Sequence, residues 1–166
     1  MDREDRVVGA VRRGDAHRDS TLIHRSVQVL IFDGSGRVLL QRRSAAKDLF
    51  PLFWCASASG HVAAGDSYDE TAARELAEEL GVHLDLTCRG KFLVASEQET
   101  EVTVLFTANS SGPFTFDPIE TCGGEFFTRD DLSAMLAKGA LKLTPATLAA
   151  LDCAGWHEVI CRDEKN

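Results

Sequence analysis

The chain has 166 residues, which is enough for one domain with a sizeable hydrophobic core. Hydrophobic residues make up 44% and charged residues 27%, as in ordinary soluble globular proteins. The net charge of -8 argues against nucleic acid or an anionic membrane as the main partner. It does not exclude a phosphorylated small molecule, because a metal ion can screen the repulsion.

The cysteines are odd in number, scattered and without a C-x-x-C motif, so we expect free thiols in a reducing compartment. They are Cys55, Cys88, Cys122, Cys153 and Cys161. The charged first residues lack the apolar segment of a signal peptide, and no apolar run approaches the roughly 20 residues of a membrane span. These features predict a cytoplasmic protein without a membrane partner.

The first part of the chain is typical of strands separated by polar turns. A short strand is expected over residues 6–12. Residues 24–32 are rich in Val, Ile and Leu and predict a buried strand, and a D-G-S-G turn connects it to a return strand over residues 37–42. A loop is expected over residues 44–51, and a Trp followed by small residues then leads into residues 60–82.

A helix is expected inside residues 60–82. Ser67 and Glu70 form an S-x-x-E capping box, which starts the helix near Tyr68, and Gly81 stands where a helix-terminating glycine belongs. The later elements are predicted strands over 91–96 and 102–108, strand and loop over 114–127, and helices over 130–138 and 144–153.

No repeat, low-complexity segment or linker interrupts the sequence. We therefore expect a single α/β domain over residues 1–166, with strands and helices mixed rather than strictly alternating. Its parts are an N-terminal strand and loop over 1–23, a core over 24–160 and a frayed tail over 161–166.

Three carboxylates crowd one face of the expected helix. Glu75, Glu78 and Glu79 occupy positions i, i+3 and i+4, so they lie on one side and repel one another by a few tenths of a kcal/mol per pair. A divalent cation bound between them would reverse the sign of that interaction. The alternative is an exposed acidic helix held by Arg–Glu pairs, since R-E-L-A-E-E-L is a common helix composition.

Residues 60–82 resemble the Nudix box, whose pattern is G-x5-E-x7-R-E-U-x-E-E-x-G-U with U aliphatic. The matching residues are Gly60, Arg74, Glu75, Leu76, Glu78, Glu79, Gly81 and Val82. Asp66 departs from the pattern, which has Glu at that position. Residues 41–62 also resemble the segment before the box in isopentenyl diphosphate isomerase and the hydrolases closest to it. The resemblance implies a Nudix-type α/β/α sandwich with a central mixed sheet.

Nudix hydrolases use the box to cleave a diphosphate that is linked to another moiety, X. The resemblance implies that Glu75 and Glu79 hold one Mg²⁺, with Mn²⁺ as an alternative, because these cations prefer oxygen ligands. Glu78 is the third ligand or a base acting on metal-bound water. Gly60, which opens the box, is assigned to the same metal site.

Other charged residues are expected to support this site. Arg74 is counted among the catalytic residues, since it would orient the carboxylates, with Asp66 as its partner behind the ligands. Arg43 and Lys47 lie where isomerase-like relatives hold a diphosphate, although ordinary solvated charge is the alternative. Glu120 is a candidate auxiliary base, because relatives often place an acidic residue near this point of the chain.

Five further residues resemble the separate metal site of isopentenyl diphosphate isomerase. They are His17, His24, His61, Glu99 and Glu101. Three histidines and two carboxylates suit Mn²⁺, Zn²⁺ or Mg²⁺. Each residue alone has an ordinary explanation as a strand cap, a loop histidine or a hairpin charge, so occupation of this second site by a divalent metal stays open.

The same comparison argues against isomerase activity. The isomerase needs a cysteine directly before G-H, and this chain has Ser59 there, a far weaker acid–base than a thiol. We therefore expect Mg²⁺-dependent hydrolysis of a nucleoside di- or triphosphate or a related X-linked diphosphate. An isopentenyl-diphosphate delta-isomerase-like enzyme and a catalytically silent phosphometabolite-binding module are the alternatives. The identity of X and a homodimer, which is frequent among relatives, are left open.

Overall fold

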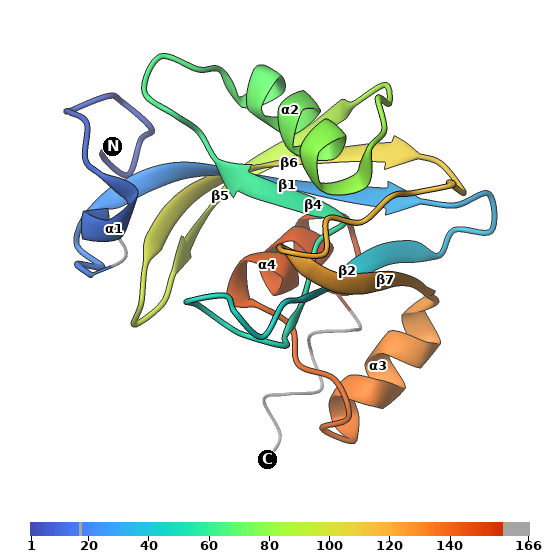
Figure 1. The fold of residues 1–166 in the computed structure, drawn as a ribbon. Helices are drawn as coiled ribbons and strands as arrows, with labels where there is room; N and C mark the ends of the chain where they lie inside the picture. Colours follow the sequence, from blue (N-terminus) through green and yellow to red (C-terminus); the bar gives the residue numbers. More distant parts are fainter. Residues whose placement is uncertain (17, 158–166) are drawn as a thin grey trace.

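The computed structural model describes residues 1–16 and 18–157, and within them a seven-stranded mixed sheet is built around strand β1, Ile23–Phe32 (Figure 1). Over its whole length β1 pairs in parallel with β6, Thr100–Asn109. The other strands are β2 Val38–Arg43, β3 Trp54–Cys55, β4 Ala58–His61, β5 Thr87–Ala95 and β7 Thr121–Phe127. The helices are α1 Arg13–Ala16, α2 Tyr68–Leu80, α3 Arg129–Ala137 and α4 Pro145–Cys153.

Strand β1 changes its antiparallel partner along its length. Near its end, Ile31 and Phe32 pair with β2, whereas residues 26–29 pair with β4. Strand β2 continues away from β1 and pairs instead with β3 and β7. Because β2 and β4 diverge beside a shared neighbour, they leave room between β1, β2 and β4 for the cavity of the candidate site.

Helices cover both faces of the sheet. Helix α2 packs on one face, where Leu76 and Leu80 join Val27, Val29 and other strand residues in one buried cluster. Helices α3 and α4 contribute to a second cluster, which includes Leu132, Leu151 and Trp156, on the opposite face (Figure 1). This arrangement confirms the α/β/α sandwich with a central mixed sheet.

Helix α2 begins and ends as its sequence predicts. The Ser67 side chain accepts a hydrogen bond from the Glu70 backbone N–H, and the Glu70 side chain accepts one from the Ser67 backbone N–H. Both bonds satisfy donors that the first turn of a helix leaves unpaired. At the other end Gly81 adopts the left-handed conformation with φ of 67°, which costs glycine little.

The strand predicted for residues 6–12 is absent. These residues have no sheet partner in the described structure, and the short helix α1 follows them. Val7 and Val8 are 68% and 71% exposed, so their apolar side chains have no face of the sheet to pack against. The β-branched composition that favours a strand gains stability only when neighbouring strands bury it, and here none does.

The described cysteines, Cys55, Cys88, Cys122 and Cys153, are all free thiols, as expected. Cys161 and the predicted frayed tail lie outside the described residues. Among the described helices, none has both the length and the apolar character that crossing a membrane requires.

We expect Leu76→Ala to lower the free energy of unfolding by about 2–5 kcal/mol, because Leu76 is fully buried under α2 and its truncation leaves a cavity. Urea denaturation of the purified protein measures this loss. Val8→Ala is the control, since Val8 is exposed and its truncation should cost less than about 0.5 kcal/mol. Equal losses in the two variants would contradict the assignment of Leu76 to the core.

Candidate functional site

A cavity of about 780 Å³ opens between β1, β2, β4 and α2, and the loop after β2 forms part of its wall. It gathers most of the residues that the sequence analysis selected. Those that line it are Arg43, Lys47, Gly60, His61, Arg74, Glu75, Glu78, Glu79, Glu99, Glu101 and Glu120. Residues far apart in the sequence thus border one space, which contains both cationic and anionic side chains.

Glu75 and Glu79 are partly buried carboxylates of helix α2, whereas Glu78 is exposed. Burial raises the pKa of Glu79 to about 7, and the neighbouring charge of Glu75 adds to this effect. Burial also raises the pKa of Glu75, although the Arg74 charge opposes the rise. Gln41 of β2 donates a hydrogen bond from Nε2 to Glu79 Oε2 at 2.7 Å. Glu75 and Glu79 therefore lie close together with little positive charge around them. That charge is too small to keep the pKa of both carboxyl groups at the ordinary value of a glutamate.

Gly60 lies directly against Glu75. A Cβ atom at residue 60 would collide with the carboxyl end of the Glu75 side chain. The absence of a side chain on β4 therefore lets the Glu75 carboxylate rest against the strand backbone. This contact explains on steric grounds why the first residue of the Nudix-like segment is a glycine. Gly60 has no side chain that could bind a metal ion.

Glu78 and Arg74 lie nearer the solvent than the partly buried pair. The Arg74 guanidinium pairs with Glu75 Oε1 at 2.8 Å and with Glu78 Oε2 at 3.2 Å. Both of these contacts of Arg74 lie within its own helix, and the expected pairing with Asp66, which is on the preceding loop, stays a prediction. The Glu78 side chain is 59% exposed. Among the described residues, the group of side chains whose ligand atoms lie close enough together to hold one metal ion does not include Glu75, Glu78 or Glu79.

The cations around the cavity already have protein partners. Arg43 donates from Nε and Nη2 to the Leu49 carbonyl oxygen at 3.1 and 3.0 Å, which holds the loop after β2. Lys47 forms an ion pair with Glu120, so these two predicted residues contact each other. Burial lowers the pKa of Lys47, and the Arg43 charge lowers it further. A phosphate that took the place of the Glu120 carboxylate beside Lys47 would lie near two cations, Lys47 and Arg43.

Arg13 is a residue that sequence reasoning missed. It belongs to α1 and lines the cavity, and its charge acts on both Lys47 and Glu75. No local motif marks it, because its place depends on how the N-terminal segment folds back over β1 and β5 (Figure 1). The only sequence signal is its position in a basic V-R-R-G-D segment of an acidic protein.

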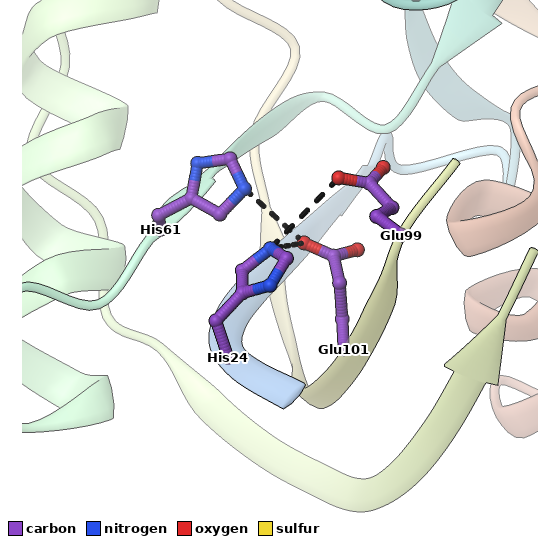
Figure 2. A group of neighbouring side chains, drawn as sticks. All are labelled: His24, His61, Glu99 and Glu101. Atoms are coloured by element: carbon purple, nitrogen blue, oxygen red, sulfur yellow. Dashed lines mark ion pairs between the residues drawn. The ribbon is translucent and has the colours of Figure 1, made fainter. Parts of the chain in front are cut away.

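A second group of side chains comes from β1, β4, β6 and the residue directly before β6 (Figure 2), and three of its members, His61, Glu99 and Glu101, also line the cavity. His24 Nε2 lies 3.2 Å from Glu101 Oε1, and His61 Nε2 lies 3.3 Å from the same oxygen. Glu99 Oε2 lies 3.8 Å from His24 Nε2. One potential ligand atom from each of these residues falls within 4.8 Å of all the others. The parallel pairing of His24 with Glu101 and the antiparallel pairing of Ser26 with His61 bring them together.

The electrostatics of this His/Glu cluster suit a cation. Burial alone would raise the pKa of Glu101, but hydrogen bonds from His24 and His61 lower it to about 2. Burial alone would lower the pKa of His24, but the hydrogen bond and charge of Glu101, with the charge of Glu99, raise it. Two imidazole nitrogens and two carboxylates form a donor set that fits Mn²⁺ or Zn²⁺. His17, the fifth predicted member, lies outside the described residues.

We expect Glu101→Gln to remove one divalent ion per chain from the protein, because Glu101 is the carboxylate that both histidines contact. To bind here, the ion must displace a proton from the His24 imidazole. The pKa of His24 is raised above its ordinary value of 6.5, so metal binding should weaken as the pH falls through this raised pKa. Metal analysis after dialysis against Mn²⁺ or Zn²⁺ at two pH values measures both effects. Glu97→Gln is the control, since it changes a nearby carboxylate outside the cluster. Unchanged metal content in Glu101→Gln would contradict this assignment.

The α/β/α sandwich and the acidic helix on the wall of a charged cavity together point to one protein family. The NUDIX domain family matches residues 22–147, and the chain belongs to this family. An isopentenyl-diphosphate Delta-isomerase of Nocardia farcinica is 37% identical over 93% of this chain and 91% of its own length. An uncharacterized Nudix hydrolase of Pseudomonas aeruginosa is 33% identical over 91% of this chain and 88% of its own length.

Solved structures agree with this assignment. DR0079 from Deinococcus radiodurans is similar to this chain with a TM-score of 0.78 and 27% identity, over 92% of this chain and 96% of its own. A MutT protein from Methanosarcina mazei has a TM-score of 0.66 at 19% identity, over 87% of this chain and 96% of its own, and this likeness supports the fold alone. The family is therefore established by both sequence and fold.

Proposed function

We propose that this protein is a Mg²⁺-dependent hydrolase that cleaves a phosphoanhydride bond in a diphosphate linked to another moiety. Nucleoside di- and triphosphates are the first substrates to test. The observation that carries the proposal is the partly buried pair Glu75 and Glu79 on the wall of a cavity that Arg43 and Lys47 also line. Such a cavity offers oxygen ligands for a cation and positive charge for a phosphorylated compound.

The carboxylates fit Mg²⁺, which prefers oxygen ligands and usually keeps several waters. Glu75 and Glu79 would hold the ion, and Glu78, which is more exposed, would be a third ligand or a base. The raised pKa of Glu79, about 7, supports this role, since a cation would compensate its buried charge. Bound Mg²⁺ would supply charge neutralisation for the phosphates and would lower the pKa of the attacking water.

The remaining charged side chains would bind the substrate and move protons. Arg43, Lys47 and Arg13 would contact the diphosphate, and Lys47 would exchange its Glu120 partner for a phosphate oxygen. Glu120, released from Lys47, or Glu78 would then accept a proton from water. A new bond forms between the water oxygen and phosphorus, the bridging P–O bond breaks, and the leaving phosphate retains the bonding electrons.

Two observations favour a second function. The His/Glu cluster and the 37% identical relative named isopentenyl-diphosphate Delta-isomerase support an isomerase of isoprenoid diphosphates. Ser59 argues against it, because a hydroxyl is a poor acid–base for a carbon centre. Cys55 also lines the cavity, but burial raises the pKa of its thiol to about 12, which keeps the thiol protonated. Hydrolysis is therefore the better supported function.

A product assay separates the two functions. The purified protein, with Mg²⁺, is incubated with nucleoside di- and triphosphates, sugar nucleotides and isopentenyl diphosphate. Release of phosphate, pyrophosphate or a phosphomonoester from any of these supports hydrolysis. Formation of the allylic isomer from isopentenyl diphosphate, without cleavage of any compound, would overturn the proposal in favour of the isomerase.

A further inference from the structure

The side chain of Gln41 is almost completely buried, at 1% exposure, between the sheet and helix α2. Its Nε2 donates to Glu79 Oε2 at 2.7 Å and to the Ser57 carbonyl oxygen at 2.5 Å. Both partners are oxygen acceptors, so the amide nitrogen must face them, and the orientation of the amide is fixed by its contacts. The amide oxygen, Oε1, consequently points away from both.

Ser57 connects this amide to the rigid part of the fold. Its hydroxyl accepts a hydrogen bond from the Ile31 backbone N–H at 2.8 Å and donates one to the Leu39 carbonyl oxygen at 2.6 Å. These partners belong to β1 and β2, at the point where the two strands pair. Gln41 therefore joins a carboxylate on a helix to the central strands, and the Glu79 side chain is held by the sheet as well as by its own helix.

Gln41 Oε1 is buried and has no hydrogen-bond partner among the described residues. A buried acceptor that is left unpaired lowers stability, and a methionine would fill a similar space without that cost. Gln41 also lines the cavity beside Glu79. Since Oε1 has almost no surface that a water molecule could reach, the group of Gln41 that acts on the site is the Nε2 donor to Glu79.

We propose that Gln41 is a positioning residue for the cation site: its Nε2 holds the Glu79 carboxylate in the orientation in which that carboxylate binds the ion. The inference rests on the proposed function in one respect, because it takes Glu79 as a ligand of the divalent cation. It adds a residue outside the acidic segment, on a different strand, to the group that determines how tightly the ion binds.

The test is a titration of the full chain with Mn²⁺ at fixed neutral pH, followed by electron paramagnetic resonance. The binding step that disappears in Glu79→Gln identifies the site of helix α2. In Gln41→Met we expect the dissociation constant of that step to rise about tenfold or more, as for other residues that orient metal ligands, with the remaining steps unchanged. Gln28→Met is the matched comparison, since Gln28 is the other buried glutamine and its Oε1 accepts a hydrogen bond from the Thr147 hydroxyl at 3.5 Å. Its Mn²⁺ steps should shift by less than about threefold.

A double variant separates positioning from a general effect on the fold. If Gln41 acts only through Glu79, the Mn²⁺ binding steps that remain in Glu79→Gln should be unchanged when Gln41→Met is added to it. Unchanged Mn²⁺ affinity in a folded Gln41→Met protein, a change in the remaining steps of the double variant, or the absence of any Glu79-dependent step would each overturn the inference. Because the readout is metal binding, a protein that binds Mn²⁺ at this step but hydrolyses no diphosphate would contradict the proposed function and leave the role of Gln41 supported.

Discussion

Glu79→Gln is expected to lower Mg²⁺-dependent phosphate release by about a hundredfold to a thousandfold. Glu79 is the most buried of the acidic side chains on α2, and it has a hydrogen bond from Gln41 that fixes one carboxylate oxygen. The amide of Gln keeps the size of the side chain but removes the negative charge that a cation requires. A loss of several kcal/mol of charge stabilisation corresponds to a rate decrease of this order.

The same variant should be at least as stable as the wild type in the absence of metal. A carboxyl whose pKa is raised on folding destabilises the folded protein once the pH exceeds its unfolded pKa of about 4.5, and the destabilisation is complete above the folded pKa, about 7. The shift corresponds to a gain of up to about 3 kcal/mol in the variant above pH 7. Thermal unfolding with a chelator at pH 5 and pH 8 measures it, and the gain should be larger at pH 8.

Glu125→Gln is the matched control for this experiment, because Glu125 is an exposed carboxylate on β7 outside the cavity. It should change neither the rate nor the pH dependence of stability. Full phosphate release by Glu79→Gln would show that the buried carboxylate is not a cation ligand. A Glu79→Gln protein that is unfolded would contradict the stability argument.

Gly60→Ala is expected to lower the same activity by about tenfold to a hundredfold with little loss of stability, on the scale of other changes that misplace metal ligands. The added methyl group would collide with the carboxyl end of Glu75, which is the flexible end of that side chain. The cheapest response is for the Glu75 carboxylate to move, so the ligand is displaced while the strand and helix keep their places. Steady-state rates at several Mg²⁺ concentrations measure the effect as an increased Mg²⁺ requirement.

Gly34→Ala provides the comparison for Gly60→Ala. A Cβ atom at residue 34 would meet nothing within 4 Å, so this substitution tests the cost of replacing a glycine without a collision. We expect unchanged activity there. If Gly60→Ala kept the wild-type Mg²⁺ dependence, the contact between Gly60 and Glu75 would have no part in cation binding.

The features that the sequence predicted well depend on residues close together in the chain. The capping box of Ser67 and Glu70, the terminating Gly81 and the carboxylate face of α2 all follow from spacings within one helix. The His/Glu cluster was also predicted, but only through resemblance to a family, since β1, β4 and β6 had to bring its members together.

The features that the sequence did not predict depend on contacts between segments that are far apart in the chain. The roles suggested for Gln41 and Arg13 have no local signal, because one needs β2 beside α2 and the other needs the N-terminal segment to fold over the sheet. The strand expected over residues 6–12 is absent for a related reason: a β-branched composition favours a strand only where a neighbouring strand is available to pair with it.

The most direct test of the central claim is the reaction of the best diphosphate substrate in water enriched in oxygen-18, with Mg²⁺, followed by phosphorus NMR of the products. We predict that one product phosphate contains a single oxygen-18 atom, that the product forms only with a divalent cation, and that Glu79→Gln abolishes it. Isomerised isopentenyl diphosphate with its phosphates intact and unlabelled, and no cleavage of any other diphosphate, would contradict the account.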